Sequence, residues 1–162
     1  MQRVPQASLG IVGGSTTWGA RFPEGFDLGL PVVKYLGEFS TPFGMSAPFK
    51  LIEYKDAVIL YVGMHGCFPN ESEMIHPYFA SKQLAWVFKQ AGVSAILGGG
   101  SVGGIQTSAG ERLPRWSVVI PNDFVMTPNI VLVPQGRIPL DNHNSPFYRM
   151  ARPFDSALSR VL

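Results

Sequence analysis

The sequence predicts an α/β protein with a mixed central sheet flanked by helices, and three observations lead to that prediction. Short apolar runs rich in β-branched and aromatic residues recur along the chain, as is typical of buried strands. One longer stretch carries its apolar residues at helical spacing. Two of the strand-like runs end on glycines followed by a serine. Alternation of buried strands with a helix indicates a layered α/β architecture.

The expected strands are short runs bounded by turn residues. In chain order they cover residues 9–12, 32–35, 49–54, 58–62, 93–97 and 117–120. Between the second and third runs lies Thr41-Pro42-Phe43-Gly44, in which proline occupies a turn position and glycine relieves the backbone. We therefore expect a hairpin or a β-meander there.

The sequence predicts a helix from Pro77 to Ala91. Its apolar residues recur at roughly three- and four-residue intervals, and Gly92 follows where a C-terminal cap belongs. Residues 128–146 are rich in proline and asparagine, which predicts a long loop.

Length, charge and cysteine content narrow the class of protein. A chain of 162 residues predicts a single domain over residues 1–162. Its formal net charge of +2, with no run of Lys or Arg, argues against nucleic acid or an anionic membrane as partner. The single Cys67 excludes an internal disulfide framework. With no apolar run of transmembrane length and no signal segment, we expect a cytoplasmic protein with a small-molecule or protein partner.

Three expected strand ends carry the residues suited to hold a ligand. They are Gly13-Gly14-Ser15, Met64-His65-Gly66 and Gly99-Gly100-Ser101. Ligands of open α/β sheets bind beyond the carboxyl ends of the strands, so these segments are candidates for one common site. Glycine lets a ligand approach the backbone, and successive N–H groups form an anion-binding concavity. Two hydroxyls and one imidazole add to the N–H groups, and that set suits phosphate.

The order of these motifs resembles a known family. The chain is similar to the N-terminal part of the trimeric purine nucleoside phosphorylases, above all to the 5′-methylthioadenosine phosphorylase branch. The resemblance covers almost the whole chain and rests on LGIVGGS (9–15), TPFG (41–44), MHG (64–66), LAWVFKQAGV (84–93), GGGSVGGI (98–105), VVIPNDFVMT (118–127) and MARPF (150–154). It implies a phosphorylase/hydrolase-like fold, here truncated to its N-terminal portion.

The activity that the resemblance implies is phosphorolysis, a step of purine salvage. Inorganic phosphate, the co-substrate, attacks the anomeric carbon of a purine nucleoside as the purine leaves, and no metal or other cofactor takes part. The transition state has oxocarbenium character, so catalysis depends on positioning phosphate and stabilising charge on the leaving base. The resemblance also implies a homotrimer.

Site residues follow from the resemblance position by position. Ser15, His65, Gly100 and Ser101 match phosphate-binding positions, and Phe147 falls near the position that the family lends to the ribose end of a neighbouring subunit's substrate.

Two departures from the family pattern concern charge. Met64 stands where the family has arginine, and a thioether cannot supply the bidentate charged fork that binds phosphate. Arg152 stands where the family usually has an acidic residue. Lys82, Arg112 and Arg115 are candidates to supply the positive charge that Met64 lacks.

Three functional hypotheses follow. The first is a nucleoside phosphorylase of the methylthioadenosine type, with this chain as its N-terminal portion. The second is a non-catalytic phosphorylase-like module that binds nucleoside, anion or a partner subunit, which Met64 and the end of the chain at Leu162 favour. A Rossmann dinucleotide domain is disfavoured, because GIVGGS lacks the G-x-G-x-x-G spacing and no helix pattern follows it.

Overall fold

The computed structural model describes residues 3–14, 22–26, 29, 32–63, 77–101, 104, 110–115, 117–121 and 154–161. Contacts divide the chain into two compact units, Met1–Gly103 and Gly104–Leu162. The elements are β1 (Leu9–Gly13), β2 (Val32–Gly37), β3 (Ser40–Thr41), β4 (Gly44–Met45), β5 (Phe49–Tyr54), β6 (Ala57–Gly63), α1 (Pro77–Ala91), β7 (Ala95–Gly98) and α2 (Leu158–Val161). The single-domain assignment stays a prediction.

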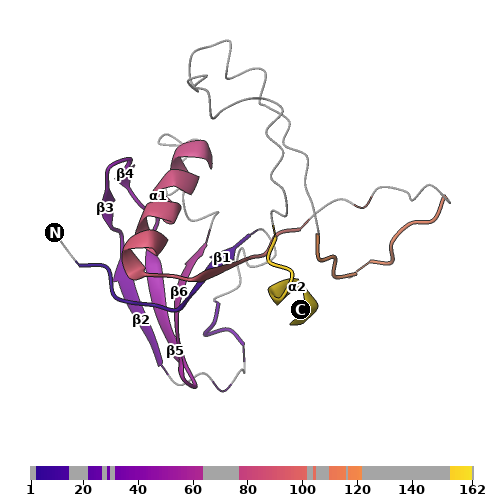
Figure 1. Cartoon of the computed structure of the whole chain (residues 1–162), viewed down its shortest axis with the longest axis horizontal. Helices are drawn as coiled ribbons and strands as arrows, with labels where there is room; N and C mark the ends of the chain where they lie inside the picture. The colour runs from indigo at the N-terminus through magenta and orange to yellow at the C-terminus, as the bar shows by residue number, and fades with distance from the viewer. Residues whose placement is uncertain are drawn as a thin grey trace, which may run out of the picture. The chain divides into compact units, whose positions relative to one another are not determined.

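The first unit is built on a five-stranded mixed sheet in the order β2-β5-β6-β1-β7 (Figure 1). β1 pairs in parallel with β6 on one side and with β7 on the other. β5 runs antiparallel to both β6 and β2. β6 and β7 lie on either side of β1, and α1 connects β6 to β7 in the chain. The mixed α/β architecture predicted from the sequence is therefore present.

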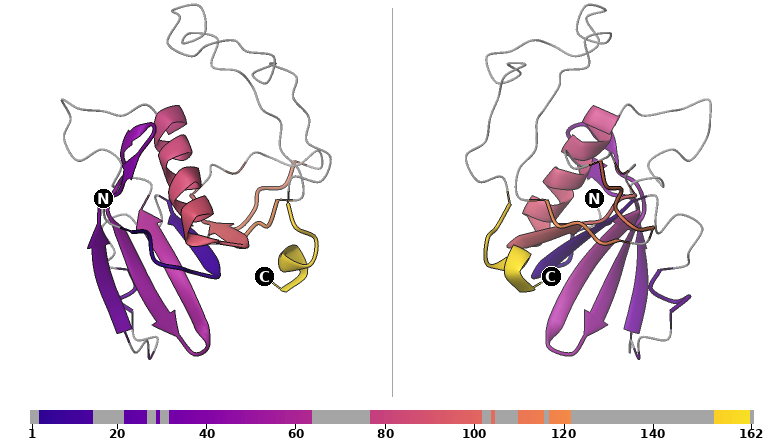
Figure 2. Two further views of the ribbon diagram at one scale, coloured as in Figure 1. Left: turned by 60° about the vertical axis from the view of Figure 1, so that its left-hand side comes forward. Right: turned by 90° about the vertical axis from the view of Figure 1, so that its right-hand side faces the viewer.

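α1 covers one face of this sheet (Figure 2). Its buried residues pack against side chains that alternate along β5 and β6 to the same face, as the two-residue period of a strand requires. The resulting core contains Val4, Ala7, Phe39, Ala47, Phe49, Leu51, Leu60, Val62, Ala80, Leu84, Val87, Phe88 and Ala91. Aromatic rings pack against one another within this core. The Phe49 ring contacts those of Phe39 and Phe88 edge to face, at centroid distances of 5.8 and 5.7 Å.

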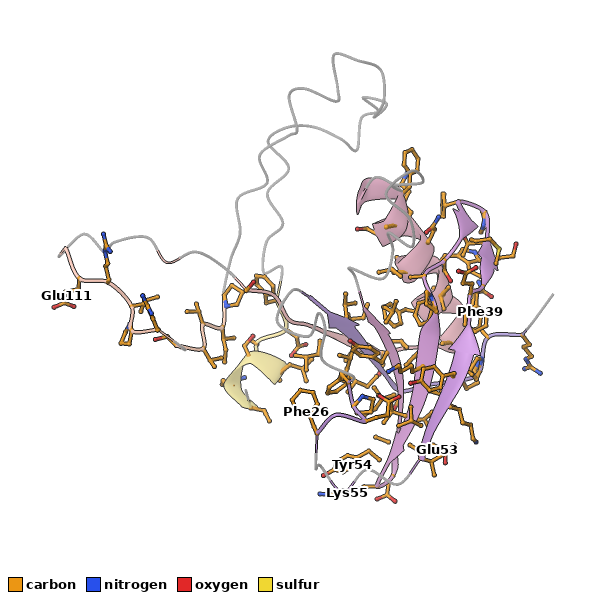
Figure 3. All side chains as sticks on the ribbon, turned by 180° about the vertical axis from the view of Figure 1, so that it is seen from behind. Phe26, Phe39, Glu53, Tyr54, Lys55 and Glu111 are labelled. Atoms are coloured by element: carbon orange, nitrogen blue, oxygen red, sulfur yellow. The ribbon has the colours of Figure 1, made fainter. Side chains whose placement is uncertain are left out.

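The opposite face is covered in part by residues 22–26, which we call the 22–26 segment. Phe22 packs on Tyr61 of β6 with ring centroids 4.9 Å apart, and Pro23 is fully buried. Figure 3 shows Phe26 and Phe39 at separate places on the first unit. Ile52, which follows Leu51 in β5 and so faces this second side, is only 1% exposed.

Several boundaries agree closely with the sequence. The helix begins at Pro77 and ends at Ala91, and Gly92 after it has a φ of 72°, as expected of a C-terminal cap. β5 spans the predicted residues 49–54. The predicted turn at 41–44 is the tip of the β3–β4 hairpin, where Gly44 adopts a φ of 100°. The predicted loop over 128–146 lies outside the described residues.

The predicted strand over Ser117–Ile120 is wrong. Residues 117–120 form no strand, and Val118, Val119 and Ile120 are 88, 55 and 39% exposed. Ser117 instead closes a turn, since its hydroxyl donates to the Pro114 carbonyl at 2.8 Å. An apolar, β-branched run becomes a strand only where a neighbouring strand accepts its backbone hydrogen bonds.

The second unit contains the short helix α2. Asp155 caps its start, because one carboxylate oxygen accepts hydrogen bonds from the backbone N–H groups of Ala157 and Leu158 at 2.8 and 2.9 Å. These two bonds, with the nearby Arg160 charge, hold the pKa of Asp155 below its ordinary value despite a smaller opposing effect of burial.

Candidate functional site

The carboxyl ends of the three parallel strands lie level with one another. Gly13, which ends β1, pairs with Gly63, which ends β6, and Val12 pairs with Gly98, which ends β7. The expectation that three strand ends meet at one edge of the sheet is therefore confirmed for the strands themselves. β1 lies between β6 and β7 in the sheet, so these three strand ends are neighbours (Figure 1).

Two of the predicted phosphate-binding residues are described. Gly100 and Ser101 follow β7 directly, and both are exposed. The Gly99 N–H donates to the Val12 carbonyl at 3.1 Å, which fastens the start of this segment to β1. Ser15, His65 and Phe147, together with Met64, lie outside the described residues.

Within the described part of the chain, neither backbone conformation nor packing requires glycine at the last residue of β7 or at the two residues that follow it. Gly98, Gly99 and Gly100 all have φ outside the left-handed region. A Cβ atom added to any of them would meet nothing within 4 Å. Gly99 and Gly100, which follow the end of the strand, leave bare backbone where a ligand can come close, although glycine costs conformational entropy on folding.

The three cations expected as replacements for the missing positive charge belong to different units of the chain. The Lys82 ammonium on α1 lies 5.5 Å from the centroid of the Phe43 ring, at the tip of the β3–β4 hairpin. Arg112 and Arg115 belong to the second unit and are exposed.

A charged cluster on the second face was not predicted from the sequence. The Lys50 ammonium donates to both carboxylate oxygens of Glu24, at 3.1 and 2.9 Å, and to the Phe22 carbonyl at 2.6 Å. The Tyr35 hydroxyl donates to the same carboxylate at 2.5 Å. The ammonium also lies 4.9 Å from the Tyr35 ring centroid and 5.9 Å from that of Tyr61. These bonds hold the 22–26 segment on the sheet.

The cluster also sets the protonation of Glu24. Partial burial raises the pKa of Glu24, but the hydrogen bonds from Tyr35, from Lys50 and from its own backbone, with the Lys50 charge, together outweigh burial, so its pKa lies below the ordinary value. The sequence signal that would reveal this pair is weak, because Glu24 and Lys50 are far apart in the chain and neither belongs to a motif.

Two further features concern the residues that the structure describes, 3–14, 22–26, 29, 32–63, 77–101, 104, 110–115, 117–121 and 154–161. No group of three or more His, Cys, Asp or Glu side chains gathers there in a way that would hold a metal ion. Among the same residues, no helix has the length and apolar character needed to cross a membrane.

Comparisons with known proteins give no match for this chain, either among family models or among curated proteins. The phosphorylase resemblance therefore rests on the motifs in the sequence.

Proposed function

We propose that this chain is the N-terminal portion of a purine nucleoside phosphorylase-like protein with the phosphorylase/hydrolase-like fold. The reaction is phosphorolysis of 5′-methylthioadenosine or a related purine nucleoside to the free base and the sugar 1-phosphate. One observation carries the proposal: β1 and β6 end in register at Gly13 and Gly63, and β7 ends at Gly98 in register with Val12, so the strands that precede the three motifs end beside one another.

In this proposal the strand ends bind inorganic phosphate, the only co-substrate. Backbone N–H groups at Gly100 and Ser101 and the Ser15 hydroxyl donate to phosphate oxygens, and His65 supplies an imidazole. A phosphate oxygen forms a bond to the anomeric carbon as the bond from that carbon to the purine nitrogen breaks. Both bonding electrons leave with the base, and Phe147 lies at the sugar end of a neighbouring subunit's substrate.

Phosphate binding is the first test of the proposal. Calorimetric titration of phosphate into the parent, Ser101→Ala and Met64→Arg should give weak binding by the parent, weaker binding by Ser101→Ala and tighter binding by Met64→Arg. A charge-assisted hydrogen bond to a charged ligand contributes about 1.5–3 kcal/mol, which is roughly a ten- to hundredfold change in affinity. All titrations share one modest salt concentration, because exposed charges are screened.

Base release is the second test. Incubation of each variant with 5′-methylthioadenosine and phosphate, followed by chromatography, should show adenine only when phosphate is present. Absence of both phosphate binding and base release from the parent and from Met64→Arg would overturn the proposal.

A non-catalytic phosphorylase-like module is the second candidate, and Met64 in the family's arginine position favours it. This candidate predicts that phosphate or nucleoside binds without release of base, even from Met64→Arg.

The proposal includes a cytoplasmic location and self-association, with a trimer implied by the resemblance. Support for association comes from large apolar side chains exposed in the first unit. Among the described residues they include Ile96 and Leu97 on strand β7, at one end of the strand order.

A further inference from the structure

The backbones that follow β1 and β7 stay in contact beyond the last pairing of the two strands. A Cβ atom built on Gly14 would lie 2.0 Å from the Gly99 carbonyl oxygen and 2.9 Å from the Gly100 Cα. Side-chain Cβ atoms essentially never come within 3.0 Å of a non-bonded atom, so position 14 excludes every side chain. The two glycine segments therefore pack backbone against backbone, a contact that we call the Gly14–Gly99 contact.

The requirement for glycine at position 14 is steric. Gly14 has φ outside the left-handed region, so its backbone conformation does not demand glycine. The contrast with Gly98 and Gly100 is informative, since a Cβ on either would meet nothing within 4 Å. Of the glycines at these two strand ends that are described, Gly14 is the one that fixes a distance between two backbones.

We propose that Gly14 is a positioning residue for the anion site, an inference that rests on the proposed function. Its bare Cα sets the distance between the end of β1 and residues 99–101, and so the spacing of the backbone N–H groups that are proposed to bind the anion. A methyl group at position 14 must move the Gly99 oxygen by about 1 Å, from 2.0 Å to at least 3.0 Å. Displacement of that size separates donors that have to converge on one phosphate.

The experiment compares Gly14→Ala with Gly98→Ala as the matched control, because both replace a glycine with alanine at the end of a parallel strand. Thermal melting and amide exchange of core residues in α1 and β5 establish whether each variant is folded. Amide exchange at Gly99, Gly100 and Ser101 by NMR then reports the Gly14–Gly99 contact without any ligand. Calorimetric titration with inorganic phosphate reports the anion site.

Folded Gly14→Ala should lose protection at the Gly99 N–H, which donates to the Val12 carbonyl, and bind phosphate roughly tenfold or more weakly, while Gly98→Ala keeps both within about twofold. Unchanged exchange at Gly99 in folded Gly14→Ala would overturn the contact. Lost protection with unchanged phosphate affinity would overturn the positioning role. If the parent binds no phosphate at all, the proposed function and the positioning role fail, yet the exchange comparison still decides the contact.

If Gly14→Ala does not fold, the proposal is tested on the unaltered protein. Added phosphate should slow amide exchange at Gly14 and at residues 99–101 together, with the same midpoint. Protection of one segment without the other would overturn the proposal.

Discussion

The ring of Phe88 in α1 lies directly over Gly10 of β1. A Cβ atom at position 10 would fall 2.8 Å from the Phe88 Cε1 and 3.0 Å from its Cδ1. Phe88 is only 3% exposed, and its ring is also packed edge to face on Phe49. Because Gly10 has no side chain, the Phe88 ring fits over β1 and the helix can approach the parallel strands.

Gly10→Ala should destabilise the first unit by about 1–3 kcal/mol, because the buried Phe88 ring has to leave its position to admit a methyl group. Chemical denaturation followed by far-ultraviolet circular dichroism measures the loss. Gly63→Ala is the control, since a Cβ there would make an ordinary 3.7 Å contact with the Tyr61 hydroxyl. Equal stability of the two variants would contradict this account of the helix packing.

Stability should fall in acid partly through Glu24. Its pKa in the folded chain lies below the ordinary value of 4.5, so its contribution is fully present above that pH and is lost as the pH falls through the folded pKa. Unfolding free energies at pH 7 and at pH 3.5 should differ more for the parent than for Glu24→Gln. The difference should be about 1 kcal/mol or less, because the Glu24 side chain is 30% exposed.

Asp155→Asn is the comparison variant for this pH dependence of stability. The pKa of Asp155 is also lowered, but Asp155 belongs to the second unit. An unchanged pH dependence in Glu24→Gln would mean that the bonds from Lys50 and Tyr35 do not persist in solution.

Gln83 offers a test of the contact between α1 and the β3–β4 hairpin. Its side chain is 2% exposed, its Nε2 donates to the Phe43 carbonyl at 2.8 Å, and its Oε1 has no partner among the described residues. Gln83→Met removes the bond and the unpaired acceptor together, so its net effect should stay within about 1 kcal/mol. Gln83→Glu should cost at least about 2 kcal/mol, because it buries a charge beside a carbonyl. Equal denaturation midpoints for the two variants would argue against this placement.

Self-association should depend on the exposed edge strand β7. Ile96 and Leu97 are 53 and 38% exposed, and the sequence holds no charged residue between Lys89 and Glu111. Uncharged, apolar edges readily accept another strand. Sedimentation of the parent should show an oligomer, and Ile96→Lys should shift it toward the monomer.

Val32→Lys on the opposite edge is the control for that measurement. β2 already carries Lys34, which is paired with Glu53 at 3.0 Å, so a second lysine there should leave association unchanged. A parent that sediments as a monomer at high concentration would contradict the prediction.

Local patterns in the sequence were sufficient for the helix and for most of the strands. The spacing of apolar residues and the capping Gly92 predict the bounds of α1, because helical periodicity and caps are encoded within a few neighbouring residues. The same holds for β5 and for the hairpin turn at 41–44. The strand ends were also predictable, since glycines interrupt each apolar run.

The wrong prediction of a strand at 117–120 and the contacts that were not predicted have the same cause. Strand formation, the Lys50–Glu24 ion pair and the Gly14–Gly99 contact each join residues that are far apart in the chain. No local pattern records which distant partner will be present.

The sequence by itself determined the helix α1, the strands β1, β2, β5, β6 and β7 to within a few residues, and which residue types follow the strand ends. Only the tertiary structure decided that β1, β6 and β7 end level, that a backbone oxygen fills the space beside Gly14, and that Lys50 faces Glu24. The physical reason is that periodicity and turn chemistry act over a few residues, whereas register, close backbone approach and charge pairing exist only once the sheet has brought distant segments together.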